Sequence, residues 1–329
     1  MKLHFIQQDP WVTPGEYLAW AERNAYEVSV TRCWLYEKLP NNADADLLVV
    51  LGGYQCPLTT IEECAYFDSA AEQNLIRQYV EAGKAVVGVC LGAQLVGEAL
   101  GAPYSHSPEK EIGTVKARLT AAGKEDPFLK AFPDEFDAGE WHNDMPGLTA
   151  ESVILAESDG CPRQIVRYGT FIYGFQTHME FTREIIAAGL EDIGGEFHAE
   201  GPYIQTPQEL LSYDYSGMNR LLSGFLDAMM GDYVVIKTIL ALGYFEFAHQ
   251  GKTYLIQTES SKGWDYLSLW RSAPDYICLH RVFFDGTVGV SAETIQELLD
   301  QPFSDEHTVR EIIQSPETEW RKAAWNDPS

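Results

Sequence analysis

The chain has 329 residues, of which 45% are hydrophobic, and it carries 49 acidic against 23 basic side chains for a formal net charge of −26. This length and composition are sufficient for one large buried core and a smaller one. A surface this acidic repels phosphate backbones and anionic lipid, so we expect no nucleic acid and no membrane as a partner.

The cysteines and the N-terminal residues indicate the cellular compartment in which we expect the protein. Six cysteines, at positions 33, 56, 64, 90, 161 and 278, form no C-x-x-C pair and show no metal-ligand spacing, so the sequence predicts no metal site. The opening residues, MKLHFIQQDPW, lack the apolar run of a signal peptide, and no segment reaches transmembrane length. We therefore expect a reduced, cytoplasmic protein without a cofactor. The sequence does not indicate the oligomeric state.

The first eighty residues alternate between strands and helices. We expect strands at 2–7, 27–34 and 46–51, a helix from the Thr13 N-cap to about Asn24, and a helix from about residue 60 to Glu81. Such alternation is typical of a mostly parallel sheet with helices on both faces. Ligands of these folds bind at the carboxyl ends of the strands, and Gly52-Gly53 follows the third strand at such an end.

The segment 85–101, AVVGVCLGAQLVGEALG, has the pattern of a buried strand followed by an amphipathic helix. Cys90 lies at the junction, with Gly88 two residues before it and Gly92 two residues after it. This is the layout of a nucleophile elbow, a sharp turn at which a flanking Cβ would collide with the neighbouring backbone. The positive end of the helix dipole also favours a thiolate there. The paired glycines favour a catalytic cysteine over a buried structural one.

Short strands are expected next, at 113–119, 152–157, 164–168 and 171–175, followed by helices at 182–188 and 207–230. Gly231-Asp232 is the predicted boundary between a domain of residues 1–230 and a small α+β domain of residues 231–329. In the second domain we expect a hairpin at Gln250-Gly251-Lys252, another at Asp285-Gly286, and helices at 292–300 and 305–314. The sequence does not indicate what this domain binds.

A base for Cys90 is available after the strand 171–175. His178 and Glu180 follow this strand, so topology brings them to the same edge of the sheet as the elbow. Their side chains leave the same face of an extended segment, so the carboxylate can orient the imidazole. A nucleophilic cysteine requires such a base and such an orienting group.

These motifs resemble the class I glutamine amidotransferase family, in the group named after the glutaminase domain of GMP synthase. The pattern G-x-C-x-G-x-Q is present as GVCLGAQ (88–94), and G-x-Q-x-H-x-E is present as GFQTHME (174–180). The likeness extends to about Met230 and includes VVLGGYQ (49–55), EIG (111–113) and EWHND (140–144). It implies the flavodoxin-like α/β fold of that family, with the small C-terminal α+β domain as an addition.

The resemblance also implies roles for single residues. Cys90 would attack the side-chain amide of glutamine, His178 would move the proton, and Glu180 would orient His178, giving a γ-glutamyl thioester that water hydrolyses to glutamate. The N–H groups of Gly53 and Leu91 would form the oxyanion hole. Substrate binding would fall to Gln94, His142 and Asp144.

Three positions depart from the family pattern. Thr177 stands where relatives usually have Phe, Met179 where they have Pro, and Tyr54 where they often have Pro. None of these side chains is required for the chemistry, so the departures bear on the shape of the pocket and of the oxyanion loop. They leave the preferred substrate open.

Two alternatives remain at this point. The chain has neither a P-loop nor a nucleotide-binding loop of the SGGxDS type, so any synthetase that accepts the ammonia would be a separate protein. The enzyme could instead be a γ-glutamyl peptidase or hydrolase with the same triad and a wider pocket. A non-enzymatic redox-sensing or chaperone-like protein would use Cys90 as an oxidisable thiol, but such a thiol needs no His178–Glu180 pair.

Overall fold

The structure is a computed structural model that describes residues 1–193, 200–261, 264–271, 277–284, 289–304 and 307–320. The chain forms two compact units, Met1–Asp227 and Ala228–Ser329. The predicted hairpin at Asp285-Gly286 lies outside the described residues. Among the helices of the described ranges, none is both long and apolar enough to cross a membrane.

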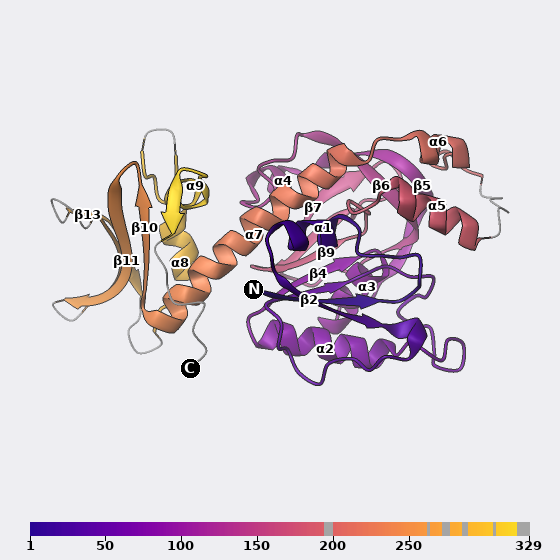
Figure 1. The fold of residues 1–329 in the computed structure, drawn as a ribbon, viewed down its shortest axis with the longest axis horizontal. Coiled ribbons are helices and arrows are strands. Elements are labelled where there is room, and N and C mark those ends of the chain that lie inside the picture. The colour runs from indigo at the N-terminus through magenta and orange to yellow at the C-terminus, as the bar shows by residue number, and fades with distance from the viewer. Residues whose placement is uncertain (194–199, 262–263, 272–276, 285–288, 305–306, 321–329) are drawn as a thin grey trace. The chain divides into compact units, whose positions relative to one another are not determined.

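A nine-stranded sheet, as far as the described residues show it, forms the centre of the first unit (Figure 1). Its strand order is β2-β1-β3-β4-β9-β8-β7-β5-β6. The strands are β1 (Lys2–Gln7), β2 (Glu27–Arg32), β3 (Leu47–Val50), β4 (Ala85–Val89), β5 (Ser105–Leu119), β6 (Glu135–Met145), β7 (Val153–Ser158), β8 (Ile165–Gly169) and β9 (Ile172–Phe175). The helices of this unit are α1 (Glu16–Arg23), the 3-10 helix η1 (Cys33–Leu35), α2 (Ser69–Glu81), α3 (Leu91–Ala99), α4 (Ala121–Glu125), α5 (Arg183–Asp192), α6 (Pro207–Ser212) and the first part of α7 (Ser216–Leu242).

The half of the sheet from β2 to β9 is parallel and covered on both faces. Every residue of β3 and β4 is buried, as their unbroken apolar runs require. On one face, α2 and α3 pack over the sheet, with Leu95 of α3 in the same core as Val86 of β4. On the other face, Phe225 of α7 contacts Tyr173 and Phe175 of β9, each at a ring distance of 5.0 Å. The predicted α/β fold class is confirmed.

The strands β8, β7, β5 and β6 extend the sheet in antiparallel fashion. Strand β6 is absent from the predicted strands, and β5 begins at Ser105, eight residues before the predicted start at Gly113. The reason is that β6 buries charged and polar positions, Glu140 and His142, where a half-buried strand normally shows apolar side chains. This strand carries part of the candidate site.

The predicted starts of the first two helices were wrong. The N-cap of α1 is Gly15, at φ +50°, and not Thr13, because the Glu16 N–H donates to the carbonyl oxygen of Glu180 at 3.3 Å. Helix α2 begins at Ser69 with Asp68 as its N-cap, since the Asp68 carboxylate accepts from the Ala71 N–H at 2.9 Å. Both starts depend on local or long-range hydrogen bonds that residue spacing alone does not specify.

The second unit contains an antiparallel sheet whose order, within the described residues, is β13-β12-β11-β10-β14. Its elements are β10 (Tyr244–His249), β11 (Lys252–Ser261), β12 (Trp264–Arg271), β13 (Ile277–Phe284), α8 (Ala292–Leu299), α9 (Val309–Gln314) and β14 (Thr318–Trp320). The hairpin at Gln250-Gly251 joins β10 to β11, as predicted, with both residues at positive φ. Strands β12 and β14 were not predicted.

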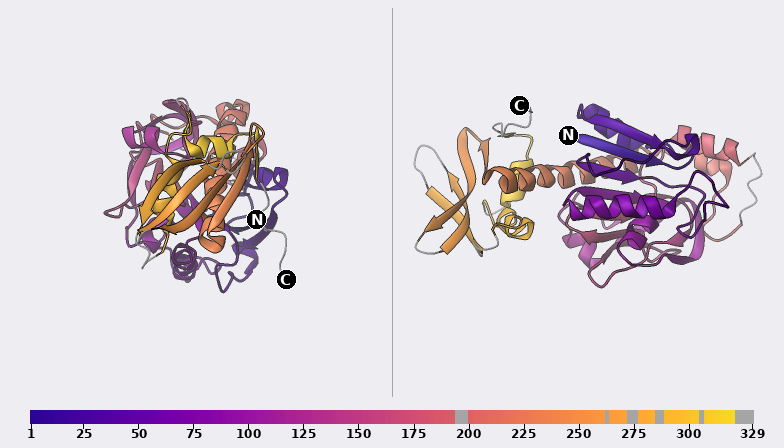
Figure 2. Two further views of the ribbon diagram at one scale, coloured as in Figure 1. Left: turned by 90° about the vertical axis from the view of Figure 1, so that its left-hand side faces the viewer. Right: turned by 90° about the horizontal axis from the view of Figure 1, so that it is seen from below.

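Helix α7 passes through the predicted domain boundary without interruption (Figure 1 and Figure 2). Gly231 lies inside this helix and does not end it. The division between the two compact units falls three residues earlier than the predicted one, between Asp227 and Ala228. The assignment of residues 1–230 and 231–329 to two domains stays a prediction.

Candidate active site

Cys90 occupies a strained turn between β4 and α3. Its φ is +53° and its ψ is −111°, a conformation that residues other than glycine rarely adopt. The Cys90 N–H donates to the carbonyl oxygen of Phe175 at 2.7 Å, which ties the turn to β9. Backbone strain of this kind persists only where the surrounding structure holds it, and it is typical of a nucleophile elbow.

The two flanking glycines are required by close backbone contacts. A Cβ on Gly92 would lie 1.9 Å from the carbonyl oxygen of Val50. A Cβ on Gly88 would lie 2.3 Å from the carbonyl oxygen of Gly92. Neither position can hold a side chain without moving the backbone, so the spacing of the glycines around Cys90 has the steric cause that the sequence indicated.

His178 and Glu180 form a buried pair beside the elbow. His178 Nδ1 lies 2.7 Å from Glu180 Oε1, and both side chains are almost completely buried. The imidazole stacks on the ring of Phe181, with 4.2 Å between centroids and 7° between planes. Burial lowers the pKa of His178, but the charge of Glu180 and the adjacent Cys90 sulfur outweigh it, and the pKa rises to about 10. The pair therefore favours a charged imidazole.

Cys90 and His178 converge above Gly52, the residue after β3 that precedes Gly53. The point where a Cβ would lie on Gly52 is 3.2 Å from His178 Cε1, 3.4 Å from Cys90 Cβ and 3.7 Å from Val12 Cγ1. The carboxyl ends of β3 and β4 thus meet at one place with the segment after β9, as the topology predicts. Glu180 holds Nδ1, which leaves the other ring nitrogen for exchange with the thiol.

These groups line a cavity of about 210 Å³ in the first unit. This is below the 300–1,000 Å³ typical of pockets for drug-sized ligands, so it suits a small substrate. Fourteen residues line it: Trp11, Val12, Gly53, Tyr54, Gln55, Cys90, Leu91, Gln94, Lys110, Trp141, His142, Asn143, Asp144 and His178. All the predicted site residues are among them except Glu180, which lies behind His178.

The predicted oxyanion-hole residues face this cavity. Leu91 is the first residue of α3, so its N–H lies at the helix start, where backbone N–H groups have no helical acceptor. Among the described residues, neither the Gly53 nor the Leu91 N–H donates to a protein acceptor. Both N–H groups are available to a developing negative charge in the cavity.

The predicted substrate-binding residues each have a protein partner. Gln94 is buried and its Nε2 donates to Gln176 Oε1 at 3.1 Å, which fixes the orientation of its amide. Asp144 pairs with the exposed His106 at 2.6 Å. His142 belongs to a buried charged cluster.

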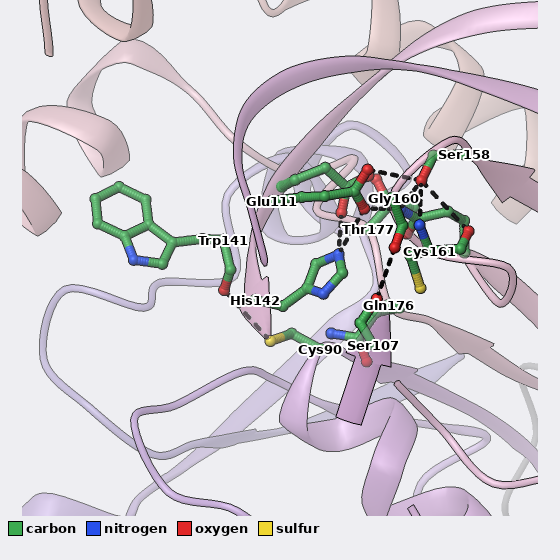
Figure 3. Close-up of polar contacts among 12 residues, drawn as sticks. Cys90, Ser107, Glu111, Trp141, His142, Ser158, Gly160, Cys161, Gln176 and Thr177 are labelled. Carbon is green, nitrogen blue, oxygen red and sulfur yellow. Dashed lines mark hydrogen bonds and ion pairs between the residues drawn. The ribbon is translucent and has the colours of Figure 1, made fainter. Parts of the chain in front are cut away.

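This cluster consists of Glu111, Glu140 and His142, and Figure 3 shows the ion pair between Glu111 and His142. His142 Nε2 is 2.9 Å from Glu140 Oε2 and 3.2 Å from Glu111 Oε2, and all three side chains are buried. The Glu111 carboxylate also accepts hydrogen bonds from Ser158 Oγ and Gln164 Nε2, each at 2.7 Å. Strands β5, β6, β7 and the start of β8 therefore supply one connected polar network.

His142 keeps its proton at neutral pH. Burial lowers the pKa of His142, but hydrogen bonding to Glu111 and Glu140 outweighs it and raises the pKa to about 10. Burial also raises the pKa of Glu140 above its usual range, although His142 opposes this shift. Two carboxylates this close in a dry environment cannot both stay charged without a cation between them.

Glu111, His142 and Cys161 could together hold a metal ion, since one ligand atom from each lies within 4.8 Å of the others. Two features favour the ion-pair network instead. The His142 nitrogen is already in contact with two carboxylates, and burial raises the pKa of the Cys161 thiol to about 12, which favours the neutral form. The expectation of no metal stays a prediction.

Several residues at the site are absent from the predicted set. Glu111 and Glu140 lie inside the motifs EIG and EWHND. A charged residue within an otherwise buried strand is the signal that could have marked them. Trp141 also lies inside EWHND, whereas Trp11 and Lys110 line the cavity without any pattern that marks them. They come from separate segments, and only the tertiary structure brings them together.

Comparison with known proteins identifies the family. Residues 19–187 match the family described as glutamine amidotransferase class-I. A glutamine amidotransferase-like protein of Salmonella typhimurium, YfeJ, is 50% identical over 232 residues, which cover 70% of this chain and 97% of that protein. One subunit of the glutamine-hydrolysing GMP synthase of Methanococcus maripaludis is 34% identical over 97 residues, which cover 29% of this chain and half (50%) of that protein.

Solved structures agree with the fold. The crystal structure of SMU.1228c is 46% identical, with a TM-score of 0.68 over 70% of this chain and 100% of that one. A glutamine amidotransferase from Thermotoga maritima, 22% identical, has a TM-score of 0.62 over 70% of this chain and 97% of that one, and it shows the same fold. The predicted family is confirmed: the chain belongs to the class I glutamine amidotransferases, a family of enzymes that hydrolyse the side-chain amide of glutamine.

Proposed function

We propose that this chain hydrolyses glutamine through the triad Cys90, His178 and Glu180. The observation that carries the proposal is the buried His178–Glu180 pair, 2.7 Å apart, next to a cysteine held at positive φ between a strand and a helix. Nucleophile, base and orienting group are the parts of the acyl-transfer triad, which is recognised by geometry and roles.

In the first step, the Cys90 sulfur bonds to the side-chain carbonyl carbon of glutamine while its proton is held on the charged imidazole of His178. The bond from that carbon to nitrogen then breaks, and His178 gives its proton to the departing ammonia. The product is a γ-glutamyl thioester on Cys90. Water, deprotonated by His178, attacks the thioester, and glutamate leaves while the thiol is restored. Glu180 stabilises the imidazolium in both halves of the reaction.

We assign the oxyanion hole to the backbone N–H groups of Gly53 and Leu91. Their freedom from protein acceptors and the position of Leu91 at the start of α3 support this assignment. We assign substrate binding to Gln94, His142 and Asp144, because all three line the same cavity as Cys90. A positively charged His142 suits the substrate's carboxylate, and Asp144 suits its ammonium group.

The destination of the ammonia is a separate question. The GMP synthase protein to which residues of this chain are similar is one subunit of its enzyme, which implies a second subunit there. We propose that ammonia released here passes to a separate synthetase protein, whose identity stays open. The cytoplasmic location also stays a prediction, while membership in an enzyme family favours catalysis over a redox-sensing role for Cys90.

The test is glutamate release from glutamine by the unmodified chain and two cysteine variants. Cys90→Ser should abolish release, and Cys278→Ser, a half-buried thiol in the second unit, serves as the matched control. Retained activity in Cys90→Ser, at the level of the control, would rule out the proposed nucleophile.

A further inference from the structure

Three aromatic side chains form one wall of the cavity: Trp11 from the segment between β1 and α1, Tyr54 from the segment after β3, and Trp141 from β6. The ring of Trp11 lies in the middle, with its centroid 5.6 Å from that of Tyr54 and 5.5 Å from that of Trp141. The planes are tilted by 48° and 51°. We call these three residues the aromatic wall.

The wall is held in place by polar contacts. The Tyr54 hydroxyl donates to Asp192 at 2.7 Å, at the end of α5, and the Tyr54 N–H donates to Asp9 at 3.2 Å. The carbonyl oxygen of Trp141 lies 3.9 Å from the Cys90 sulfur (Figure 3). Trp11 is only 8% exposed, whereas Tyr54 is 53% exposed. The wall therefore runs from the buried end of the cavity to its rim.

The wall and the buried charged cluster lie on different sides of β6. Trp141 and His142 are consecutive residues of this strand, so their side chains leave opposite faces. Figure 3 shows the Trp141 ring pointing away from His142 and Glu111. The cavity thus has a charged side, suited to the amino-acid end of a substrate, and an aromatic side.

The aromatic side is also the side of His178. Val12, the neighbour of Trp11, flanks the same point above Gly52 as the His178 ring does, at 3.7 Å and 3.2 Å. His178 is the residue that protonates the departing nitrogen in the proposed function. A group attached to that nitrogen would therefore extend toward the aromatic wall, whereas ammonia has no apolar surface to place there.

We propose that the aromatic wall binds the amine part of N-substituted γ-glutamyl amides, so that the enzyme hydrolyses γ-glutamyl amides of apolar or aromatic amines in addition to glutamine. The inference rests on the proposed function. The Cys90 sulfur bonds to the amide carbon, the bond from carbon to the substituted nitrogen breaks, and His178 gives its proton to the amine that leaves. Water then releases glutamate from the thioester.

The experiment compares kcat/KM for glutamine, γ-glutamylethylamide and γ-glutamyl-p-nitroanilide in the unmodified chain and in three variants. Tyr54→Ala and Trp11→Ala each remove part of the wall. Tyr36→Ala is the control, because Tyr36 is an exposed aromatic side chain that does not line the cavity. We expect either wall variant to lower kcat/KM for the p-nitroanilide about tenfold more than it lowers the value for glutamine.

The outcomes separate this inference from the proposed function. If the unmodified chain hydrolyses glutamine but neither substituted amide, the aromatic wall has no role as an amine site and the inference fails alone. Equal losses on all substrates in Tyr54→Ala would also overturn it. Hydrolysis of none of the three substrates by the unmodified chain would overturn both proposals. If Trp11→Ala does not fold, Tyr54→Ala still tests the inference, because the Tyr54 side chain is half exposed and the fold does not depend on its burial.

Discussion

Two buried histidines flank Cys90, and their surroundings differ in one respect. His178 has a single carboxylate partner, on Nδ1, stacks on Phe181, and lies next to Cys90. His142 has two carboxylate partners, Glu111 and Glu140, on the same nitrogen. The first arrangement leaves a site for proton exchange, and the second holds a positive charge in place.

The comparison teaches that a similar pKa shift can serve two purposes. Both imidazoles have their pKa raised to about 10 against the effect of burial. Only His178 also has the geometry of a catalytic base, because its partner is on the nitrogen that faces away from the cysteine. We therefore expect substitutions at His178 to affect the chemical step, and substitutions at His142 to affect substrate binding and stability.

The largest expected effect is that of His178→Asn. Loss of the base should lower kcat for glutamine hydrolysis about 10³-fold, in line with the 10²–10⁴-fold typical of general acid–base catalysis. His142→Asn should instead raise KM, with kcat reduced less than about tenfold. Steady-state kinetics at neutral pH measures both. Equal losses of kcat in the two variants would remove the distinction between the two histidines.

A smaller effect is expected from the carboxylates. Glu180→Gln should lower kcat/KM about 10²-fold, because the imidazolium of His178 loses its partner and burial then lowers its pKa. Glu140→Gln should cost less than about tenfold, since Glu111 still faces His142 at 3.2 Å and keeps its positive charge paired. A pH–rate profile adds a second readout. The lower limb of the Glu180→Gln profile should shift, and that of Glu140→Gln should not.

The sequence predicted the elbow and the His178–Glu180 pair, and it missed the second charged cluster. The conformation of residues 88–92 can be predicted from the sequence because both glycines prevent close contacts. A Cβ on Gly88 would collide with Gly92 in the same turn, and a Cβ on Gly92 would collide with Val50 of the adjacent β3. Glu111 and Glu140 are distant in sequence from each other, and the positive charge of His142 between them offsets the cost of their burial. Charged residues in a strand indicate exposure until the partner is known. The predicted start of α1 was wrong for the same reason, because the N–H of its first residue, Glu16, donates to the carbonyl oxygen of the distant Glu180.

The effect of pH on stability tests both histidines together. Their pKa values are raised from 6.5 to about 10 by folding, so the stability they confer is fully present below about pH 6.5 and is lost as the pH rises toward 10. The raised pKa of Glu140 acts in the same direction. We expect Tm to fall between about pH 6.5 and about pH 9.5, and to fall less steeply in His142→Asn. An unchanged slope in the variant would show that His142 does not carry the shift.

The smallest expected effect is that of Phe181→Leu. The variant keeps an apolar side chain but removes the ring stacked on His178, an interaction typical of about 0.5–1.5 kcal/mol. We expect kcat to fall a few-fold, with KM unchanged. The control is Phe225→Leu, which removes an aromatic contact with β9 away from the cavity and should lower Tm without lowering kcat. A loss of kcat equal to that of His178→Asn would mean that the stack positions the whole triad.

The central claim, that Cys90 forms a covalent γ-glutamyl intermediate, is tested most directly by labelling with a diazo-ketone analogue of glutamine. The labelled chain is digested and the modified peptide is identified by mass spectrometry, with and without competing glutamine. We predict one label per chain, on Cys90, which glutamine prevents and which His178→Asn slows. A label on another cysteine, or hydrolysis that continues in chains fully labelled at Cys90, would contradict the account.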